Sequence, residues 1–257
     1  MPQFFGDILR RWGMFGILAL AMVPAVQCGI GLNFGISMGI VGGLLGGIIV
    51  IQLNIAQNPS LVAIHPLFAA WVAILVAILI GVVLATGIGY LYGLLLNRVK
   101  GSEMTVTTYV GFSVIAFMNM VWMLLPFDNG ELIWPNAGKG MRNTISLASS
   151  FSEVMNKTMA FGMGDFLFPT GLLLFFFLMC FLVWLFMRSK TGMAMTAAGA
   201  NPMFAKAAGI NVNKMRLIGT TISTVLAAVG ILVYALVARP WMTEWENCLL
   251  YTSPSPR

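Results

Sequence analysis

Long apolar segments without charged residues constrain this chain more than any other feature. From Leu61 to Asn97 there is no Asp, Glu, Lys or Arg, and a helix needs only about 20 apolar residues to cross a bilayer. Of the 257 residues, 59% are hydrophobic and 9% charged, and the mean hydropathy is +0.92. A soluble fold cannot hide that much apolar surface. We therefore expect an all-α, polytopic transmembrane helical bundle.

The apolar runs give the expected spans. The run from Leu61 is too long for one ordinary span, and a break at Thr86–Gly89 would divide it. The polar connection Pro126–Asp165 is slightly acidic, and we expect it outside the cell. The other spans are expected from near Met14, at Ile36–Leu53, Met104–Leu125, Phe166–Met187 and Leu217–Ala238.

A glycine-rich stretch lies early in the chain. Pro24–Gly47 holds eight glycines around Gln27, Asn33 and Ser37. An unbroken helix does not need so many glycines, although small residues do allow close helix packing. Broken helices are tolerated where the backbone faces protein or a water-filled cavity. We expect a broken or re-entrant helix here.

The distribution of charge predicts the topology. The 14 Lys and Arg exceed the 8 Asp and Glu, but most basic residues lie between apolar runs, so nucleic acid is not an expected partner. Arg188–Arg216 carries five basic residues and no acid, which places it in the cytoplasm by the positive-inside rule. The same rule places Arg10, Arg11, Arg98 and Lys100 inside. If successive spans alternate in direction across the membrane, then either Leu61–Asn97 crosses twice or a segment of the N-terminal half is re-entrant.

Groups for proton transfer or catalysis are scarce. Every Asp and Glu lies outside the expected spans, and the sole histidine, His65, precedes Pro66 at the start of one. We interpret His65 as a helix-end residue, with a proton relay as the alternative. The chain has no H-E-x-x-H, G-x-S-x-G or Walker A motif. Cys28, Cys180 and Cys248 show no paired spacing, so we interpret them as packing residues.

A short helix with both ends specified is expected inside the basic loop. Asn201 is a good N-cap, Pro202 suits the first helical position, and Gly209 fits the position after the helix. Exposed Met203 and Phe204 would suit docking into a partner's groove. The alternative is an ordinary capped connector.

The same loop carries a recognisable motif. From Gly192 it reads G-x-x-x-x-A-A-G-x-N-P-x-x-A-x-x-x-G-I-N-V, which resembles the cytoplasmic signature of ABC importer permeases of the ribose and branched-chain amino-acid type. In that family the loop forms the coupling helix that seats on the ATP-binding subunit. The resemblance implies that the contact would be made by Asn201, Pro202, Phe204, Ala205, Lys206 and Gly209.

The resemblance implies a function and an assembly. The chain would be the permease subunit of an ATP-driven importer, a multi-pass protein of the cytoplasmic membrane that carries a simple sugar or nucleoside. It would not be an enzyme and would hold no cofactor, since ATP would bind a separate subunit. The expected partners are that ATP-binding subunit, a second permease chain, an extracytoplasmic binding protein and membrane lipid. The alternative function is an ATP-independent secondary transporter.

Four polar residues are candidates for a translocation path. Polar side chains are expensive in a bilayer and tend to line cavities or join helices. Hydrogen bonding between helices is the alternative role for each of them. The candidates are Gln27, Asn33, Ser37 and Asn119.

The C-terminal end differs from the rest. We assign residues 1–240 to a single permease domain, which the resemblance implies is incomplete because such permeases continue for several more helices. The tail 241–257 is not assigned to that domain. Its last part, 248–257, resembles translated sequencing-adapter read-through.

Overall fold

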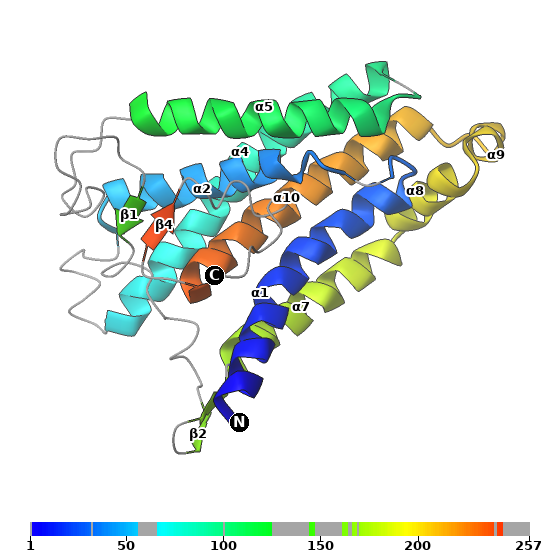
Figure 1. The fold of residues 1–257 in the computed structure, drawn as a ribbon. Helices are drawn as coiled ribbons and strands as arrows, with labels where there is room; N and C mark the ends of the chain where they lie inside the picture. Colours follow the sequence, from blue (N-terminus) through cyan, green and yellow to red (C-terminus); the bar gives the residue numbers. More distant parts are fainter. Residues whose placement is uncertain are drawn as a thin grey trace.

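The chain folds mainly into α-helices (Figure 1). The computed structural model describes residues 2–31, 33–55, 66–99, 101–124, 144–146, 161–163, 166–168, 170–238 and 241–243. His65, Lys100 and Cys248 lie outside these residues, as does 248–257. The helices are α1 (Pro2–Gln27), α2 (Ile36–Gln52), α4 (Pro66–Arg98), α5 (Glu103–Leu124), α7 (Thr170–Met187), α8 (Lys190–Ala200), α9 (Pro202–Ala207) and α10 (Val212–Ala238).

Four three-residue strands accompany the helices. They are β1 (Thr144–Ser146), β2 (Phe161–Met163), β3 (Phe166–Phe168) and β4 (Trp241–Thr243). β1 pairs antiparallel with β4, and β2 with β3. β4 lies in the tail 241–257, which was not assigned to the permease domain from the sequence. The strands are too short to change the fold class, so the predicted all-α bundle is confirmed.

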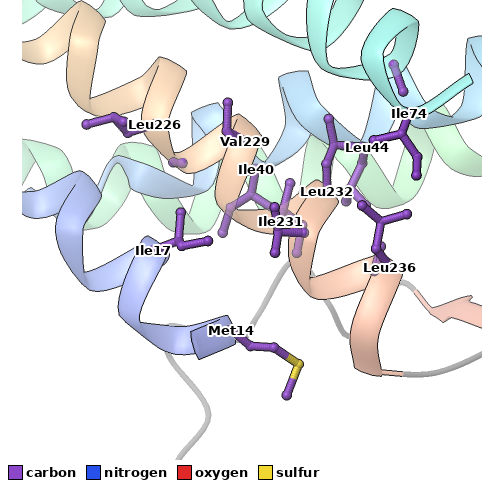
Figure 2. Packing of buried hydrophobic residues seen from close by; sticks show 14 of the residues in the cluster. Met14, Ile17, Ile40, Leu44, Ile74, Leu226, Val229, Ile231, Leu232 and Leu236 are labelled. Carbon is purple, nitrogen blue, oxygen red and sulfur yellow. The ribbon is translucent and has the colours of Figure 1, made fainter. Parts of the chain in front are cut away.

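Helix α10 lies at the centre of the bundle. It packs against α1, α2 and α4, and 67% of its apolar window is buried, against 22–39% for the other spans. Figure 2 shows its side chains Leu226, Val229, Ile231, Leu232 and Leu236 among apolar residues of the three neighbouring helices. The core therefore forms around the last long helix of the chain.

The glycines of α2 permit close helix packing. A Cβ placed on Gly46 would lie 2.6 Å from the backbone nitrogen of Gly81 in α4. On the other side, a Cβ on Gly43 would lie 2.5 Å from the carbonyl oxygen of Ala228 in α10. Small residues let helix backbones approach in this way. These glycines keep α2 between two neighbours rather than breaking it.

The interruption in the glycine-rich stretch lies before α2. Helix α1 ends at Gln27, and the amides of Gly29 and Ile30 donate to the carbonyls of Val26 and Ala25 at 3.1 and 3.3 Å. This is the Schellman pattern, which needs a residue with positive φ after the helix. Gly29 has φ +78°. A re-entrant course of the stretch remains a prediction.

Most of the expected spans correspond to helices. Five described helices are long and apolar enough to cross a membrane, and the shorter apolar helix α2 accompanies them. Many large apolar side chains on α4, α5 and α7 are exposed, among them Leu79, Tyr109 and Phe177. In water such surfaces would be unfavourable, whereas lipid covers them without cost. The chain is a multi-pass integral membrane protein.

Two expected boundaries were wrong. The residues Phe166–Phe168 form β3, and α7 begins only at Thr170. The expected break at Thr86–Gly89 is also wrong, because α4 is continuous from Pro66 to Arg98. Thr86 donates from Oγ1 to the Val82 carbonyl at 2.7 Å within the helix, and Gly89 faces α10, where a Cβ would meet Thr224. The glycine serves packing rather than interruption.

The expectation that Arg10 and Arg11 share a side with the basic loop is wrong. Trp12 packs on Phe176 near the start of α7, with ring centroids 5.4 Å apart, whereas the other end of α1 meets α8. The two arginines therefore lie at the opposite end of the bundle from α8 and α9 (Figure 1). With the start of α1 on the side opposite to the basic loop, successive spans can alternate in direction without a double crossing. Of the two alternatives for the alternation of spans, the double crossing by Leu61–Asn97 is not seen in the described part of that run, because Pro66–Arg98 is one helix.

Candidate functional site

Helix α9 begins with a side-chain cap. The Oδ1 of Asn201 accepts hydrogen bonds from the amides of Met203 and Phe204, each at 3.1 Å. Pro202 occupies the first helical position, where its missing N–H has no intrahelical partner to lose. The predicted start of the short helix is confirmed.

The other end of α9 is closed by Gly209. The amide of Gly209 donates to the carbonyl of Lys206 at 3.0 Å, and the amide of Ile210 donates to that of Ala205 at 2.9 Å. Gly209 has φ +80°, a conformation that glycine adopts without strain. Both ends of this six-residue helix are thus fixed by local bonds, as the sequence indicates.

One face of α9 is anchored and the other is largely exposed. Ala205 is fully buried in a small apolar cluster with Ala198 of α8 and Val212 of α10. Met203 and Phe204 are 77% and 69% exposed. We call Met203, Phe204 and Lys206 the α9 surface. It presents two large apolar side chains and a cation at one end of the bundle.

Helix α8 connects this surface to the end of α1. Helix α8 was not predicted from the sequence; it begins at Lys190, and the Oγ of Ser189 accepts from the Gly192 amide at 3.2 Å. Near its other end, a Cβ on Gly199 would lie 2.8 Å from the Gly29 nitrogen, so the two backbones are in direct contact. A displacement of α8 would therefore press on the turn that follows α1.

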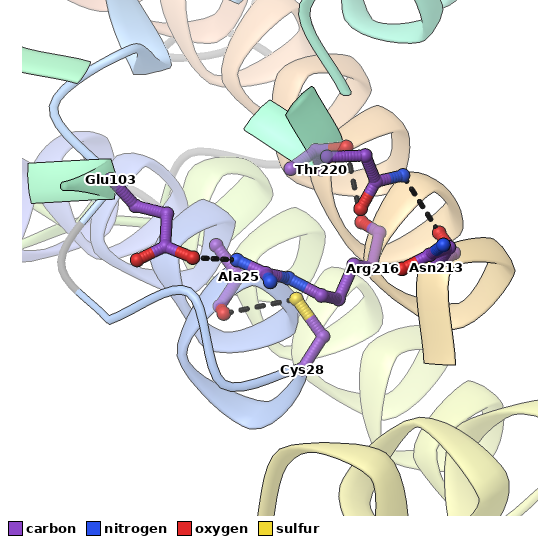
Figure 3. A network of polar contacts seen from close by, with 7 residues as sticks. Ala25, Cys28, Glu103, Asn213, Arg216 and Thr220 are labelled. Atoms are coloured by element: carbon purple, nitrogen blue, oxygen red, sulfur yellow. Dashed lines mark hydrogen bonds and ion pairs between the residues drawn. The ribbon is translucent and has the colours of Figure 1, made fainter. Parts of the chain in front are cut away.

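An ion pair joins α10 to α5 at the same end. Arg216 donates from Nη2 to Oε1 of Glu103, and both side chains are largely buried (Figure 3). Nearby, Nδ2 of Asn97 donates to the carbonyl of Asn213 at 2.9 Å. These contacts hold α4, α5 and α10 together beside α9. Arg98 also lies at this end, which confirms that it shares a side with the basic loop.

Cys28 lies beside Arg216 and is shielded from solvent. Its thiol donates to the carbonyl of Ala25 at 3.1 Å (Figure 3), and the residue is 1% exposed. Burial raises the pKa of the Cys28 thiol to about 11, because removing water disfavours the thiolate. Cys28 is a packing residue, as predicted.

A cavity of about 230 Å³ opens between α1, α8, α9 and α10. We call it the α9 cavity. Lys206 and Arg216 contribute its charged side chains, and Cys28, Ala198, Pro202 and Val212 form apolar parts of its wall. Within the described part of the chain, no group of His, Cys, Asp or Glu could hold a metal ion.

Two of the predicted path residues are committed to internal bonds. Asn33 is fully buried; its Oδ1 accepts from the Tyr92 hydroxyl at 2.7 Å and from the Gly35 amide at 3.1 Å, and its Nδ2 donates to Ser223 at 3.2 Å. Ser37 is also buried, and its hydroxyl donates to the Gly111 carbonyl of α5 at 3.4 Å. Both residues join helices, which was the alternative interpretation.

The other two path residues lie apart from Asn33. Gln27 is exposed at the end of α1 that meets α8. Asn119 lies on α5, half-buried, with its Oδ1 buried and without a hydrogen-bond partner. Among the four candidates, Asn119 is therefore the one with an unsatisfied acceptor inside a span. A substrate path through these residues remains a prediction.

The comparisons with known proteins identify a family. A family model described as branched-chain amino acid transport system / permease component matches residues 4–249. No curated protein and no solved structure matches the chain.

Proposed function

The chain belongs to the family of branched-chain amino acid transport system permease components, and from this premise we propose that it couples ATP hydrolysis on a separate subunit to solute import. It serves as the membrane-spanning permease subunit. The proposal assigns it no chemistry of its own. Its α9 surface is the seat of the ATP-binding subunit, and its bundle supplies part of the path.

The α9 surface is the observation that carries this proposal. Exposed Met203 and Phe204 lie on a helix whose two ends are fixed by capping bonds. A pre-formed helix loses little conformational entropy on docking. Burying a Met or Phe side chain contributes about 1.5–3 kcal/mol. Such a surface suits the groove of a cytoplasmic partner.

The contacts behind the α9 surface suggest how docking reaches the bundle. Helix α9 packs through Ala205 on α8 and α10. Helix α8 contacts the turn after α1 through Gly199 and Gly29, and that turn leads to Asn33, which bonds to α4 and α10. A shift of α9 would bias the packing of three long helices. Import requires such a two-state change in which side the path faces.

We propose that the solute is a small neutral polar molecule, a simple sugar or nucleoside. The two candidate path residues whose side chains are not committed to the internal bonds described above, Gln27 and Asn119, are neutral amides. The described charged residues lie toward the ends of the bundle, as Arg98, Glu103 and Arg216 do. Hydroxyl-rich solutes are recognised by neutral hydrogen-bonding groups, whereas a zwitterionic amino acid would gain from paired charges. An uptake assay should therefore compare simple sugars and nucleosides with branched-chain amino acids, which are the solutes that the proposal disfavours.

The remaining partners follow from the same proposal. An importer of this kind uses two permease chains, two ATP-binding subunits and a binding protein outside the cell. The exposed apolar faces of α4, α5 and α7 would be shared between a second permease chain and lipid. The N-terminal end of α1 would face the binding protein, since it lies opposite α9 (Figure 1).

A transport assay with two double variants tests the proposed function. The chain is reconstituted in vesicles with the ATP-binding subunit identified by its G-x-x-x-x-G-K-[ST] motif in the gene neighbourhood. Phe204→Ala with Lys206→Ala removes most of the α9 surface, and ATP-driven uptake should fall at least tenfold. Phe181→Ala with Lys214→Ala removes the same residue types at exposed positions elsewhere and should preserve uptake. Uptake that survives the first change and ignores ATP would instead identify a secondary transporter.

A further inference from the structure

The α9 cavity is lined by two cationic side chains, one of which also belongs to the α9 surface. Lys206 reaches it from α9 and Arg216 from α10. Arg216 is already paired with Glu103, whereas Lys206 is exposed and has no ion pair within the described residues. The three side chains together leave one uncompensated positive charge at the cavity.

The cavity lies at the level where membrane-spanning segments end. Cys28 follows the span Ile8–Gln27 directly, and Val212 is the first residue of the span Val212–Leu236. Phosphate groups of lipids occupy this level of a bilayer. Basic pockets between transmembrane helices on the cytoplasmic side bind anionic headgroups.

The walls suit a ligand with a charged head and an apolar body. Ala198, Pro202, Val212 and Cys28 present apolar groups beside the two cations. A volume of about 230 Å³ is ample for a phosphate group. The exposed Met203 and Phe204 do not line this cavity, so a protein that buries these two side chains would leave the cavity for a smaller ligand.

We propose that the α9 cavity binds a phosphate group, held between Lys206 and Arg216. Its source is the headgroup of an anionic phospholipid or free phosphate. The bound anion bridges α9 to α10 and fixes the coupling helix against the bundle. Because Lys206 also belongs to the α9 surface, the test uses the permease chain alone, so that its outcome does not depend on docking of the ATP-binding subunit.

The test titrates a phosphate-containing lipid onto the purified chain. Phosphatidylglycerol is added to neutral detergent micelles at increasing mole fraction, with phosphatidylcholine as the zwitterionic reference, and the melting temperature reports binding. Phosphatidylglycerol should raise the melting temperature more than phosphatidylcholine does. Lys206→Gln should weaken the response about fivefold, because a lysine near an anionic surface contributes about 1 kcal/mol.

Two variants and a second ligand complete the design. Lys206→Arg keeps the charge and should keep the response. Lys214→Gln removes an exposed lysine at the same end that does not line the cavity, and it should respond like the parent chain. Inorganic phosphate, compared with chloride at equal ionic strength, separates the two sources of the phosphate group. A rise in the melting temperature with inorganic phosphate would show that the site also binds the free ion. A rise with phosphatidylglycerol alone would assign the site to the lipid headgroup.

The proposal fails if neither ligand raises the melting temperature, or if Lys206→Gln and Lys214→Gln weaken the response equally, since either result reduces the effect to general surface charge. Native mass spectrometry of the same samples supplies a second measurement. The parent chain should retain phosphatidylglycerol that the Lys206→Gln variant releases, and equal retention would overturn the site.

Discussion

At the scale of the residue, the chain uses similar amides for different tasks. Asn201 caps a helix at an exposed end, Asn33 joins three segments inside the bundle, and Asn119 has a buried oxygen without a partner. A buried polar group is stabilising only when its hydrogen bonds are made. Asn33 therefore belongs to the architecture, whereas the buried oxygen of Asn119 has no partner within the described residues.

Replacing Asn33 should lower stability more than replacing Asn119. Asn33→Ala leaves the Tyr92 hydroxyl and the Gly35 amide without their acceptor, which should cost about 1–3 kcal/mol of unfolding free energy. Asn119→Ala removes a buried oxygen that has no partner and should not lower stability. Reversible unfolding in mixed micelles measures both, and equal losses would contradict the distinction.

The thiol of Cys28 should resist modification in the folded chain. With its pKa raised to about 11, only about one thiol in a thousand is ionised at pH 8, and the residue is 1% exposed. In a variant with Cys180→Ala and Cys248→Ala, maleimide should label Cys28 slowly at pH 7–8 and rapidly after denaturation in SDS. Equal labelling rates in the folded and the denatured chain would show that Cys28 is accessible to solvent in the folded chain.

Whether a contact between two residues could be predicted from the sequence depends on how far apart the residues lie along the chain. The cap of Asn201 was predictable because its partners follow two and three positions later. The partners of Asn33 lie 59 and 190 positions away, and the ion pair between Glu103 and Arg216 spans 113. A single sequence carries no signal for such pairings, so Tyr92, Ser223 and Glu103 were not identified.

At the scale of the element, glycines decide which helix faces meet. The glycine at 46 brings α2 against α4, and the one at 43 brings it against α10. The sequence indicated small-residue packing, but it also indicated a break in α4 that does not form. Composition alone cannot separate a glycine that allows close approach from one that interrupts a helix, because both uses rest on the missing Cβ.

Two glycine substitutions should have opposite effects. In Gly46→Ala the new Cβ would meet the Gly81 backbone at 2.6 Å, which forces α2 and α4 apart and should cost about 1–3 kcal/mol. In Gly87→Ala nothing lies within 4 Å of the new Cβ. Higher helix propensity should then stabilise the chain by about 0.5–1 kcal/mol. Thermal unfolding of both variants is the measurement, and similar shifts would contradict the packing of α2.

At the scale of the whole molecule, the helix directions assign each end to one side. Helices α1 and α7 run toward α8 and α9, and α10 runs away from them (Figure 1). The positive-inside rule located the basic loop, but it misplaced Arg10 and Arg11, because two charges weigh little against the many basic residues at the other end. The direction of α1 is fixed by packing on α7, which the sequence does not reveal.

Accessibility from the two sides of the membrane should confirm this topology. In a background without the native cysteines, Met203→Cys and Ile8→Cys place a thiol at positions that are 77% and 61% exposed. An impermeant maleimide should label position 203 only from the cytoplasm. Position 8 should be labelled only from outside the cell. Labelling of both positions from the same side would contradict the assigned direction of α1 across the membrane.

If the α9 surface seats an ATP-binding subunit, the two proteins should bind each other through it in solution. The purified permease chain is titrated with that subunit in detergent. The parent chain should bind saturably, and Phe204→Ala should weaken binding about tenfold or more, because burial of the ring contributes about 1.5–3 kcal/mol. Phe181→Ala, an exposed phenylalanine of α7, should bind like the parent. Equal affinity of the Phe204→Ala variant and the parent chain would contradict the account.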